Sequence, residues 1–169
     1  GGNGYWNEPS NWSGGVPGES DEVVIAKKVT VTLTEAVKVA SLTLSDSATL
    51  HVTARPLNDV TVFDPAKYAN EEARRDAVAA ALWANRTIVE VTGAFVVDAG
   101  CTVQPENDKI TGTPVVFKVG SASIAGTINA TGMGWGWELL SEDSAERPDN
   151  DVPPGALAQH NLNGSVWLY

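Results

Sequence analysis

The feature that most constrains this chain is a series of short runs of β-branched residues, each closed by Gly or by small polar residues. In the run VTVTL, Val29, Val31 and Leu33 alternate with Thr, so a strand here has one apolar and one polar face. Similar runs fill residues 21–63 and 86–132. Because tight corners favour Gly, Asn, Asp and Ser, this rhythm is typical of stacked rungs. The sequence therefore predicts a mostly β fold.

One segment, residues 64–85, breaks the strand series and predicts a helix. Asp64 can cap its start and Pro65 suits the first helical position, while Ala, Glu, Arg and Leu dominate the residues that follow. Its apolar stripe is mostly alanine, so we expect the helix to lie close against a surface, with Trp83 anchoring its end. The residues just before it, VTVF at 60–63, are predicted as a strand.

The length of the chain favours a single β-rich domain. A protein of 169 residues can bury roughly two-thirds of the surface of its unfolded state, enough for one core without a disulfide or a metal. The expected parts are an aromatic N-terminal cap or arm (1–20), strands (21–63), the inserted helix (64–85), strands (86–132), a long loop (133–164) and a terminal strand (165–169).

The charge balance excludes two classes of partner. The chain has 21 acidic against 11 basic side chains, a net charge of −10 and a pI near 4.5. Long-range repulsion therefore opposes nucleic acid and anionic membrane surfaces. No stretch approaches the ~20 apolar residues of a membrane span, so no membrane insertion is expected.

The compartment is inferred from less direct features. Cys101 is the one cysteine, so no internal disulfide can form. The first residue is Gly1 and not Met, which we interpret as a processed or trimmed chain. We expect an extracellular or cell-surface protein from which a signal peptide has been removed.

The segment from Trp6 to Ile25 carries a resemblance to a known group of proteins. Its sequence, WNEPSNWSGGVPGESDEVVI, holds a Trp, a second Trp within NWSGGVPG, a polar spacer and a Val/Ile strand. It resembles the segment that introduces a right-handed parallel β-helix in secreted bacterial surface proteins of the autotransporter-passenger and adhesin type. The runs SLTLSDSATLHV and IAGTINATG are similar to rungs of those families. The resemblance implies export and architecture, whereas such proteins serve as scaffolds, adhesins or enzymes.

The predicted architecture is therefore all-β with one inserted helix, arranged as a short right-handed β-helix or solenoid. About five to seven rungs of about 20–25 residues fit this chain, and so short a stack exposes two apolar ends that need caps or partners. An antiparallel β-sandwich of the jelly-roll type is the alternative, because short alternating strands also suit two packed antiparallel sheets.

Residues that could support catalysis are scarce. His51 and His160 are the two histidines, and neither stands in the context of a nucleophile elbow or a triad, so we expect no enzyme activity. The long loop contains an acidic stretch at residues 142–151, which we interpret as a solvated loop. Calcium is the one cofactor left open there, with the candidate ligands Glu142, Asp143, Asp149 and Asp151 and an ordering role.

Two tryptophans, Trp135 and Trp137 in GMGWGWE, share one face of the chain if the segment is extended. Sugar rings stack on such platforms, so a carbohydrate contact is one hypothesis. Packing against the open end of the stack or against another subunit is the favoured interpretation.

The terminal segments carry the functional prediction. Their apolar side chains are Tyr5, Trp6, Trp12, Val166, Trp167, Leu168 and Tyr169. We expect an extracellular structural or adhesive protein that assembles with copies of itself through these segments, as a filament or surface-layer subunit, because an unpaired strand can complete the sheet edge of a neighbour. The alternatives are a carbohydrate-binding module, a fragment of a polysaccharide-active β-helix enzyme, or a phage or viral fibre domain.

Overall fold

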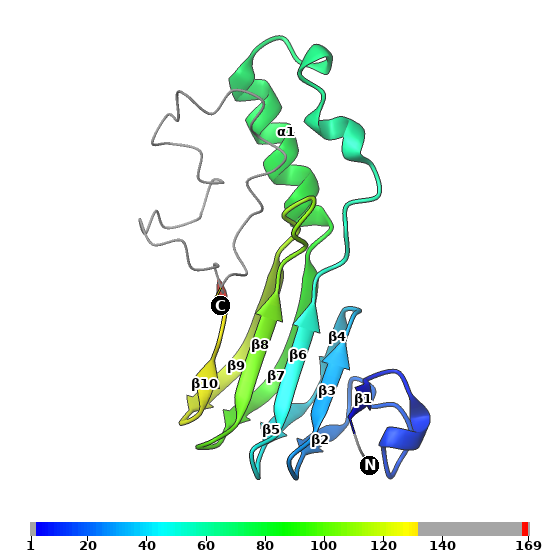
Figure 1. Cartoon of the computed structure of the whole chain (residues 1–169), viewed down its shortest axis with the longest axis vertical. Helices are drawn as coiled ribbons and strands as arrows, with labels where there is room; N and C mark the ends of the chain where they lie inside the picture. The colour runs from blue at the N-terminus through cyan, green and yellow to red at the C-terminus, as the bar shows by residue number, and fades with distance from the viewer. Residues whose placement is uncertain (1–2, 132–166, 169) are drawn as a thin grey trace.

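The computed structural model describes residues 3–131 and the backbone of residues 167 and 168. Within them the protein is mostly β with one α-helix, so the predicted composition of elements is confirmed (Figure 1). The strands are β1 (Gly4–Tyr5), β2 (Glu22–Ile25), β3 (Thr30–Leu33), β4 (Val37–Val39), β5 (Ser41–Leu44), β6 (Thr49–Thr53), β7 (Thr87–Val97), β8 (Thr102–Glu106), β9 (Val115–Ile124), β10 (Thr127–Ile128) and β11 (Trp167–Leu168). The helical segments are η1 (Pro9–Asn11), η2 (Val60–Phe63), η3 (Pro65–Lys67) and α1 (Glu71–Ala84).

The strands form two sheets, and each strand pair among the described residues is parallel. One sheet has the order β1-β3-β6-β8-β10 and the other β11-β9-β7-β5-β2, with β4 also on β7. Successive strands of the chain mostly alternate between the two sheets. The antiparallel sandwich that the sequence left open is therefore wrong for the described strands.

The register places equivalent residues of successive strands side by side. Val31, Leu50, Val103 and Ile128 form one column across the first sheet. The first three are buried, because every second side chain of each strand points between the sheets. Each such buried Val or Leu contributes roughly 1.5–3 kcal/mol relative to an exposed one. The alternation in the sequence thus becomes one continuous apolar interior.

The second sheet bends at a corner that requires glycine. β4 and β5 both pair with β7, and the β7–β9 register shifts between Val91 and Ala94. A Cβ on Gly93 would lie 2.8 Å from the Ala40 carbonyl oxygen, and one on Gly120 would lie 2.3 Å from that of Thr92. No side chain fits so close to a backbone oxygen, so the sheet can turn here only with glycine.

The main core lies between the two sheets and extends from the N-terminal cap to β9. Phe95 and Phe117 stack at its centre, with ring centroids 5.6 Å apart. Cys101 is buried in the same core as a free thiol. One core therefore joins the strands before the helix to those after it.

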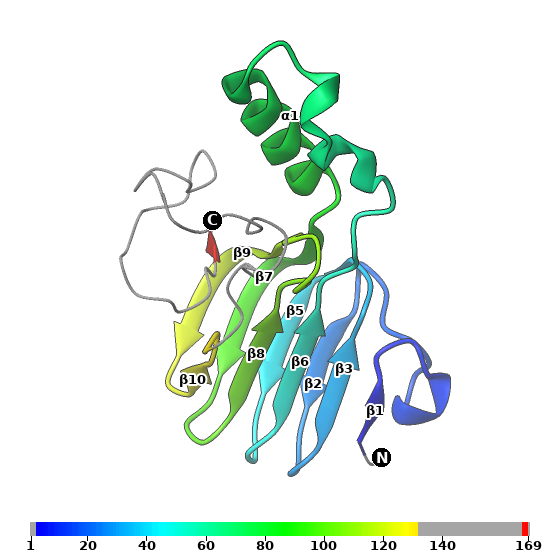
Figure 2. The same cartoon turned by 45° about the horizontal axis from the view of Figure 1, so that its top comes forward.

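The helix belongs to an insert that leaves β6 and returns to β7 (Figures 1 and 2). Its own small apolar cluster holds Leu57, Val78 and Leu82, with Val62, Phe63 and Ala81 against them. α1 packs on η2 and η3 and projects beyond the ends of the strands, so the surface that it lies against is formed by these two turns. Trp83 is 41% exposed at its end and does not anchor it in a core.

Two predictions about this insert are wrong. Residues 60–63 form the 3-10 helix η2, and α1 begins at Glu71 after the cap Asn70, whose side chain accepts a hydrogen bond from the Ala73 amide at 2.8 Å. Asp64 and Pro65 instead start η3, a separate turn.

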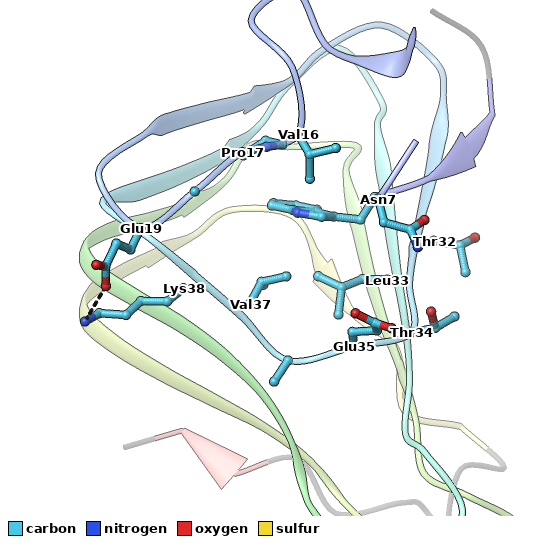
Figure 3. Close-up of a pocket in the computed structure, with 13 residues that line it drawn as sticks. Asn7, Val16, Pro17, Glu19, Thr32, Leu33, Thr34, Glu35, Val37 and Lys38 are labelled. Carbon is cyan, nitrogen blue, oxygen red and sulfur yellow. Dashed lines mark ion pairs between the residues drawn. The ribbon is translucent and has the colours of Figure 1, made fainter. Parts of the chain in front are cut away.

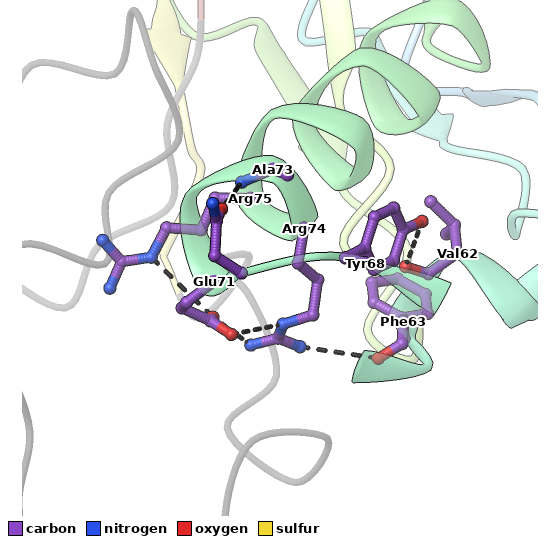
Figure 4. A network of polar contacts seen from close by, with 8 residues as sticks. Val62, Phe63, Tyr68, Glu71, Ala73, Arg74 and Arg75 are labelled. Carbon is purple, nitrogen blue, oxygen red and sulfur yellow. Dashed lines mark hydrogen bonds and ion pairs between the residues drawn. The ribbon is translucent and has the colours of Figure 1, made fainter. Parts of the chain in front are cut away.

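A polar network joins the start of α1 to these turns (Figure 4). The Arg74 guanidinium donates to the Glu71 carboxylate and, at 3.5 Å, to the Phe63 carbonyl oxygen. The Tyr68 hydroxyl donates to the Val62 carbonyl oxygen at 3.0 Å. The hydrogen bond from Arg74 holds the pKa of Glu71 below its usual value.

Candidate functional site

The N-terminal end of the strand stack is closed by two tryptophans. Trp6 is 4% exposed and belongs to the main core, and Trp12 packs edge-on against it with ring centroids 4.9 Å apart. The Trp12 indole N–H donates a hydrogen bond to the Trp6 carbonyl oxygen at 2.7 Å. The Trp6 backbone amide donates to the Thr32 carbonyl oxygen at 2.8 Å. Tyr5, expected to share this role, is 58% exposed.

A pocket of about 370 Å³ lies beside this cap. It is lined by Trp6, Asn7, Val16, Pro17, Gly18, Glu19 and residues 32–38. An ion pair between Lys38 and Glu19, at 3.0 Å, stands at one side and Thr32 and Glu35 at the other (Figure 3). The hydrogen bond to Glu19 raises the pKa of Lys38. The Trp6 indole nitrogen is buried without a hydrogen-bond partner in the described protein, so the pocket reaches the ring but not its N–H.

The opposite end of the stack is much less covered. Val23 and Ile25, at the N-terminal end of the second sheet, are 3% and 2% exposed. Through the strand register, Ala122 at the C-terminal end aligns with Val23, and Ile124 aligns with Ile25. Nevertheless Ala122 is exposed and Ile124 is 38% exposed. Within residues 3–131 the two ends of the strand stack therefore differ: one is capped by aromatic rings, and the other has inward-facing apolar side chains that stay exposed.

Both ends also carry strands that pair on one side only among the described residues. β2 pairs with β5, and the part of β9 from Ser121 to Ile124 pairs with β7. β11 adjoins the other half of β9, with Trp167 beside Val116. Unpaired backbone N–H and C=O groups on such edges can accept a further strand.

A row of alternating charges runs along the outer surface of the second sheet. Lys38 pairs with Glu19, Lys118 pairs with Glu90 at 3.1 Å, and Lys38 stands beside Glu90 in register. The row begins with an acidic residue at the capped end and finishes with a basic one near the open end. Exposed pairs of this kind add about 0–1 kcal/mol each and mainly set orientation.

His51 lies on the outer face of the first sheet, hydrogen-bonded through Nε2 to Glu106 at 2.8 Å. Lys109 binds the other oxygen of Glu106 at 3.0 Å, and the hydrogen bond from Lys109, with that from His51, holds the pKa of Glu106 below its usual value. His51 does not line the pocket beside the tryptophan cap. The triplet fits a structural clamp between β6 and β8.

Several predicted site residues lie outside the described part of the chain. They are Trp135, Trp137, Glu142, Asp143, Asp149, Asp151, Val166 and Tyr169, and of Trp167 and Leu168 only the backbone is described. Residues 3–131 contain no group of three or more His, Cys, Asp or Glu side chains placed to hold a metal. No helix in the described residues is both long and apolar enough to cross a membrane.

The sequence analysis missed a basic pocket formed by Arg55 and Arg86 with their neighbours. The two arginines are far apart in the sequence and no motif links them. Only the return of the insert to the sheets brings them together. The sequence also gave no sign that Ser121–Ile124 pairs on one side only among the described residues, because this depends on which strands lie next to each other.

Comparisons of the chain with protein-family models, with curated proteins and with solved structures found no match. The function proposed below therefore rests on the residues of this chain.

Proposed function

We propose that this chain is an extracellular structural subunit, a short right-handed β-helix whose copies associate end to end. The β-helix is supported by the columns of parallel strands. The register shift between Val91 and Ala94, beside Gly93 and Gly120, divides the second sheet into two halves, which together with the first sheet fit a turn of three sides. Parallel strands joined by right-handed crossovers are the rule in proteins.

The observation that carries the functional proposal is the difference between the two ends. A stack of rungs needs caps with a polar outer surface if it is to remain monomeric. The N-terminal end is covered by Trp6 and Trp12, whereas within residues 3–131 Ala122 and Ile124 remain exposed at the other end. Association with a second copy removes these apolar side chains from water.

The strand edges favour a head-to-tail arrangement. β2 and Ser121–Ile124 form opposite edges of the same column of parallel strands, so an added copy continues the existing strand direction. Exposed apolar residues surround the capped end, with Tyr5, Val16 and Val24 at 58%, 42% and 60% exposure. A contact between two different surfaces builds an open filament unless its rotation closes a ring.

The first test compares two aspartate substitutions on neighbouring strands. We expect Ile124→Asp to weaken self-association at least about tenfold, because an unpaired charge in an apolar contact costs several kcal/mol. Val96→Asp is the matched control, since Val96 points outward in the middle of the sheet and should leave association unchanged. Sedimentation velocity over a range of concentrations and negative-stain microscopy of the whole chain give the readout. A wild-type protein that stays monomeric at high concentration contradicts the proposal.

A crosslinking experiment separates head-to-tail from tail-to-tail contacts. Val24 and Ser123 lie at opposite edges of one outward column through Thr43 and Val96. With a short bismaleimide, the double variant Val24→Cys/Ser123→Cys should give a ladder of multimers and Ser123→Cys alone should give monomers. Dimers from Ser123→Cys alone would show that two open ends meet and that no filament forms. Cys101 is buried, so it does not compete for the reagent.

A further inference from the structure

A second pocket, of about 300 Å³, lies where the insert joins the two sheets. It is lined by Arg55, Pro56, Asn58, Ala84, Asn85 and Arg86. The first three residues belong to the segment that leaves β6, and the last three to the segment that enters β7. We propose that this pocket binds an oxyanion, such as a carboxylate, sulfate or phosphate group, between the guanidinium groups of Arg55 and Arg86.

The charge of the pocket is the opposite of that of the chain. The protein has a net charge of −10, yet two of its 11 basic side chains line one pocket, and none of the described residues that line it is acidic. Two like charges held together repel, and binding an anion relieves that repulsion. The pocket is therefore suited to the ligand class that the rest of the surface repels.

The backbone of Arg55 is held in place, whereas its side chain is not engaged. Its amide donates to the Thr87 hydroxyl at 3.2 Å, and its carbonyl oxygen accepts a hydrogen bond from the Thr113 hydroxyl. Both threonines are buried, at 2% and 0% exposure. Within the described residues the Arg55 guanidinium makes no hydrogen bond or ion pair, so its donors are available to a ligand. Arg86 directly precedes Thr87, which fixes the spacing of the two arginines.

Arg86 is oriented by the end of α1. Its guanidinium lies over the Trp83 ring, 4.6 Å from the centroid, and donates to the Trp83 carbonyl oxygen. Because a guanidinium has five donors in a planar fork, this bond leaves others for an oxyanion. The Asn85 side-chain amide donates to the Ala81 carbonyl oxygen at 2.8 Å, and Asn85 and Asn58 both line the pocket.

The end of α1 opposes an anion only weakly. A helix C-terminus carries about half an elementary negative charge, screened by solvent and limited to the last turn. Two full positive charges outweigh it. Arginine also matches the planar, bidentate geometry of carboxylate, sulfate and phosphate groups, so the pocket recognises the anionic group itself. This inference does not depend on the proposed self-association, because the pocket lies away from both ends of the strand stack.

The test titrates the whole chain with sodium acetate, sodium sulfate and sodium phosphate at constant ionic strength, followed by calorimetry and tryptophan fluorescence. Constant ionic strength matters because salt alone screens exposed charges. We expect saturable binding of at least one probe, and the preferred probe identifies the anionic group. Trp83 adjoins Arg86, so we expect its fluorescence to change as the anion binds. No saturable binding of any probe overturns the proposal.

Substitutions locate the site. Arg55→Gln should weaken binding at least about tenfold, the effect of losing a hydrogen bond to a charged group, and Arg55→Lys should weaken it less, because Lys keeps the charge but not the fork. Lys28→Gln, an equal loss of charge on an exposed turn, is the control and should bind as the wild type does. An unchanged melting temperature of Arg55→Gln shows that the fold is intact. Equal weakening by Lys28→Gln, or wild-type binding by Arg55→Gln, overturns the proposal.

Discussion

Gly93 and Gly120 occupy the positions at which the second sheet bends, and each lies against a backbone oxygen of the neighbouring strand. The sequence places a glycine after TIVEVT and another after PVVFKV, so corners could be expected at both. The close approach of each glycine to a backbone oxygen could not be expected from the sequence, because it depends on the pairing of β7 with β4 and β9. At the scale of single residues, the constraint is steric.

This constraint gives a stability prediction. We expect Gly120→Ala to lower the free energy of unfolding by about 1–3 kcal/mol, because the new methyl group would lie 2.3 Å from the Thr92 carbonyl oxygen and the sheet must shift. Gly14→Ala is the control, since nothing lies within 4 Å of a Cβ there. Urea denaturation of both variants measures the difference. Equal stability of the two variants would contradict a glycine-dependent corner.

The strands were largely predictable as elements, and the insert was not. Alternation of apolar and polar residues marks β2, β3, β5, β6 and β8 nearly at their observed bounds. The same alternation is misleading in VTVF, residues 60–63, which the insert folds into a 3-10 turn. The capping signal at Asp64 is real but belongs to η3, because a second cap, Asn70, lies closer to the apolar residues that α1 buries.

The N-cap residue Asn70 leads to a prediction about the stability of α1. We expect Asn70→Ala to destabilise α1 by about 1 kcal/mol, which is about fivefold faster hydrogen exchange of the amides of residues 75–84. Asp64→Ala removes only the bond to the Ala66 amide in η3 and should leave the exchange of α1 nearly unchanged. Exchange in β6 and β8 provides the internal reference. Equal acceleration by the two variants would mean that the helix depends on Asp64.

At the scale of the whole molecule, the described residues form two apolar clusters that share no residue. The larger fills the space between the sheets, and the smaller, around Leu57, Val78 and Leu82, holds the insert together. The two ends of the insert adjoin each other, because the Arg55 amide donates to the Thr87 hydroxyl at 3.2 Å. A short connection could therefore join β6 to β7 directly, without the insert.

Replacing residues 58–84 by a short Gly/Ser linker tests this independence. We expect the helical signal in the circular dichroism spectrum to disappear while the β signal and a cooperative unfolding transition remain. Phe95→Ala in the whole chain is the comparison, with an expected loss of about 3–5 kcal/mol because it opens a cavity in the main core. Loss of cooperative unfolding in the shortened chain would show that the insert is part of one folding unit.

The sequence by itself determined the kinds of element, because hydrophobic periodicity, glycine corners and aromatic residues act over a few neighbouring positions. Trp6 and Trp12 as an N-terminal cap follow from it, as does the alternation that buries Val31 and Leu50. Only the tertiary structure decided that the strands pair in parallel, that Ile124 stays exposed at one end of the described strands, and that Arg55 and Arg86 line one pocket. These features depend on contacts between residues far apart in the chain, and such contacts are set by the packing of the whole molecule.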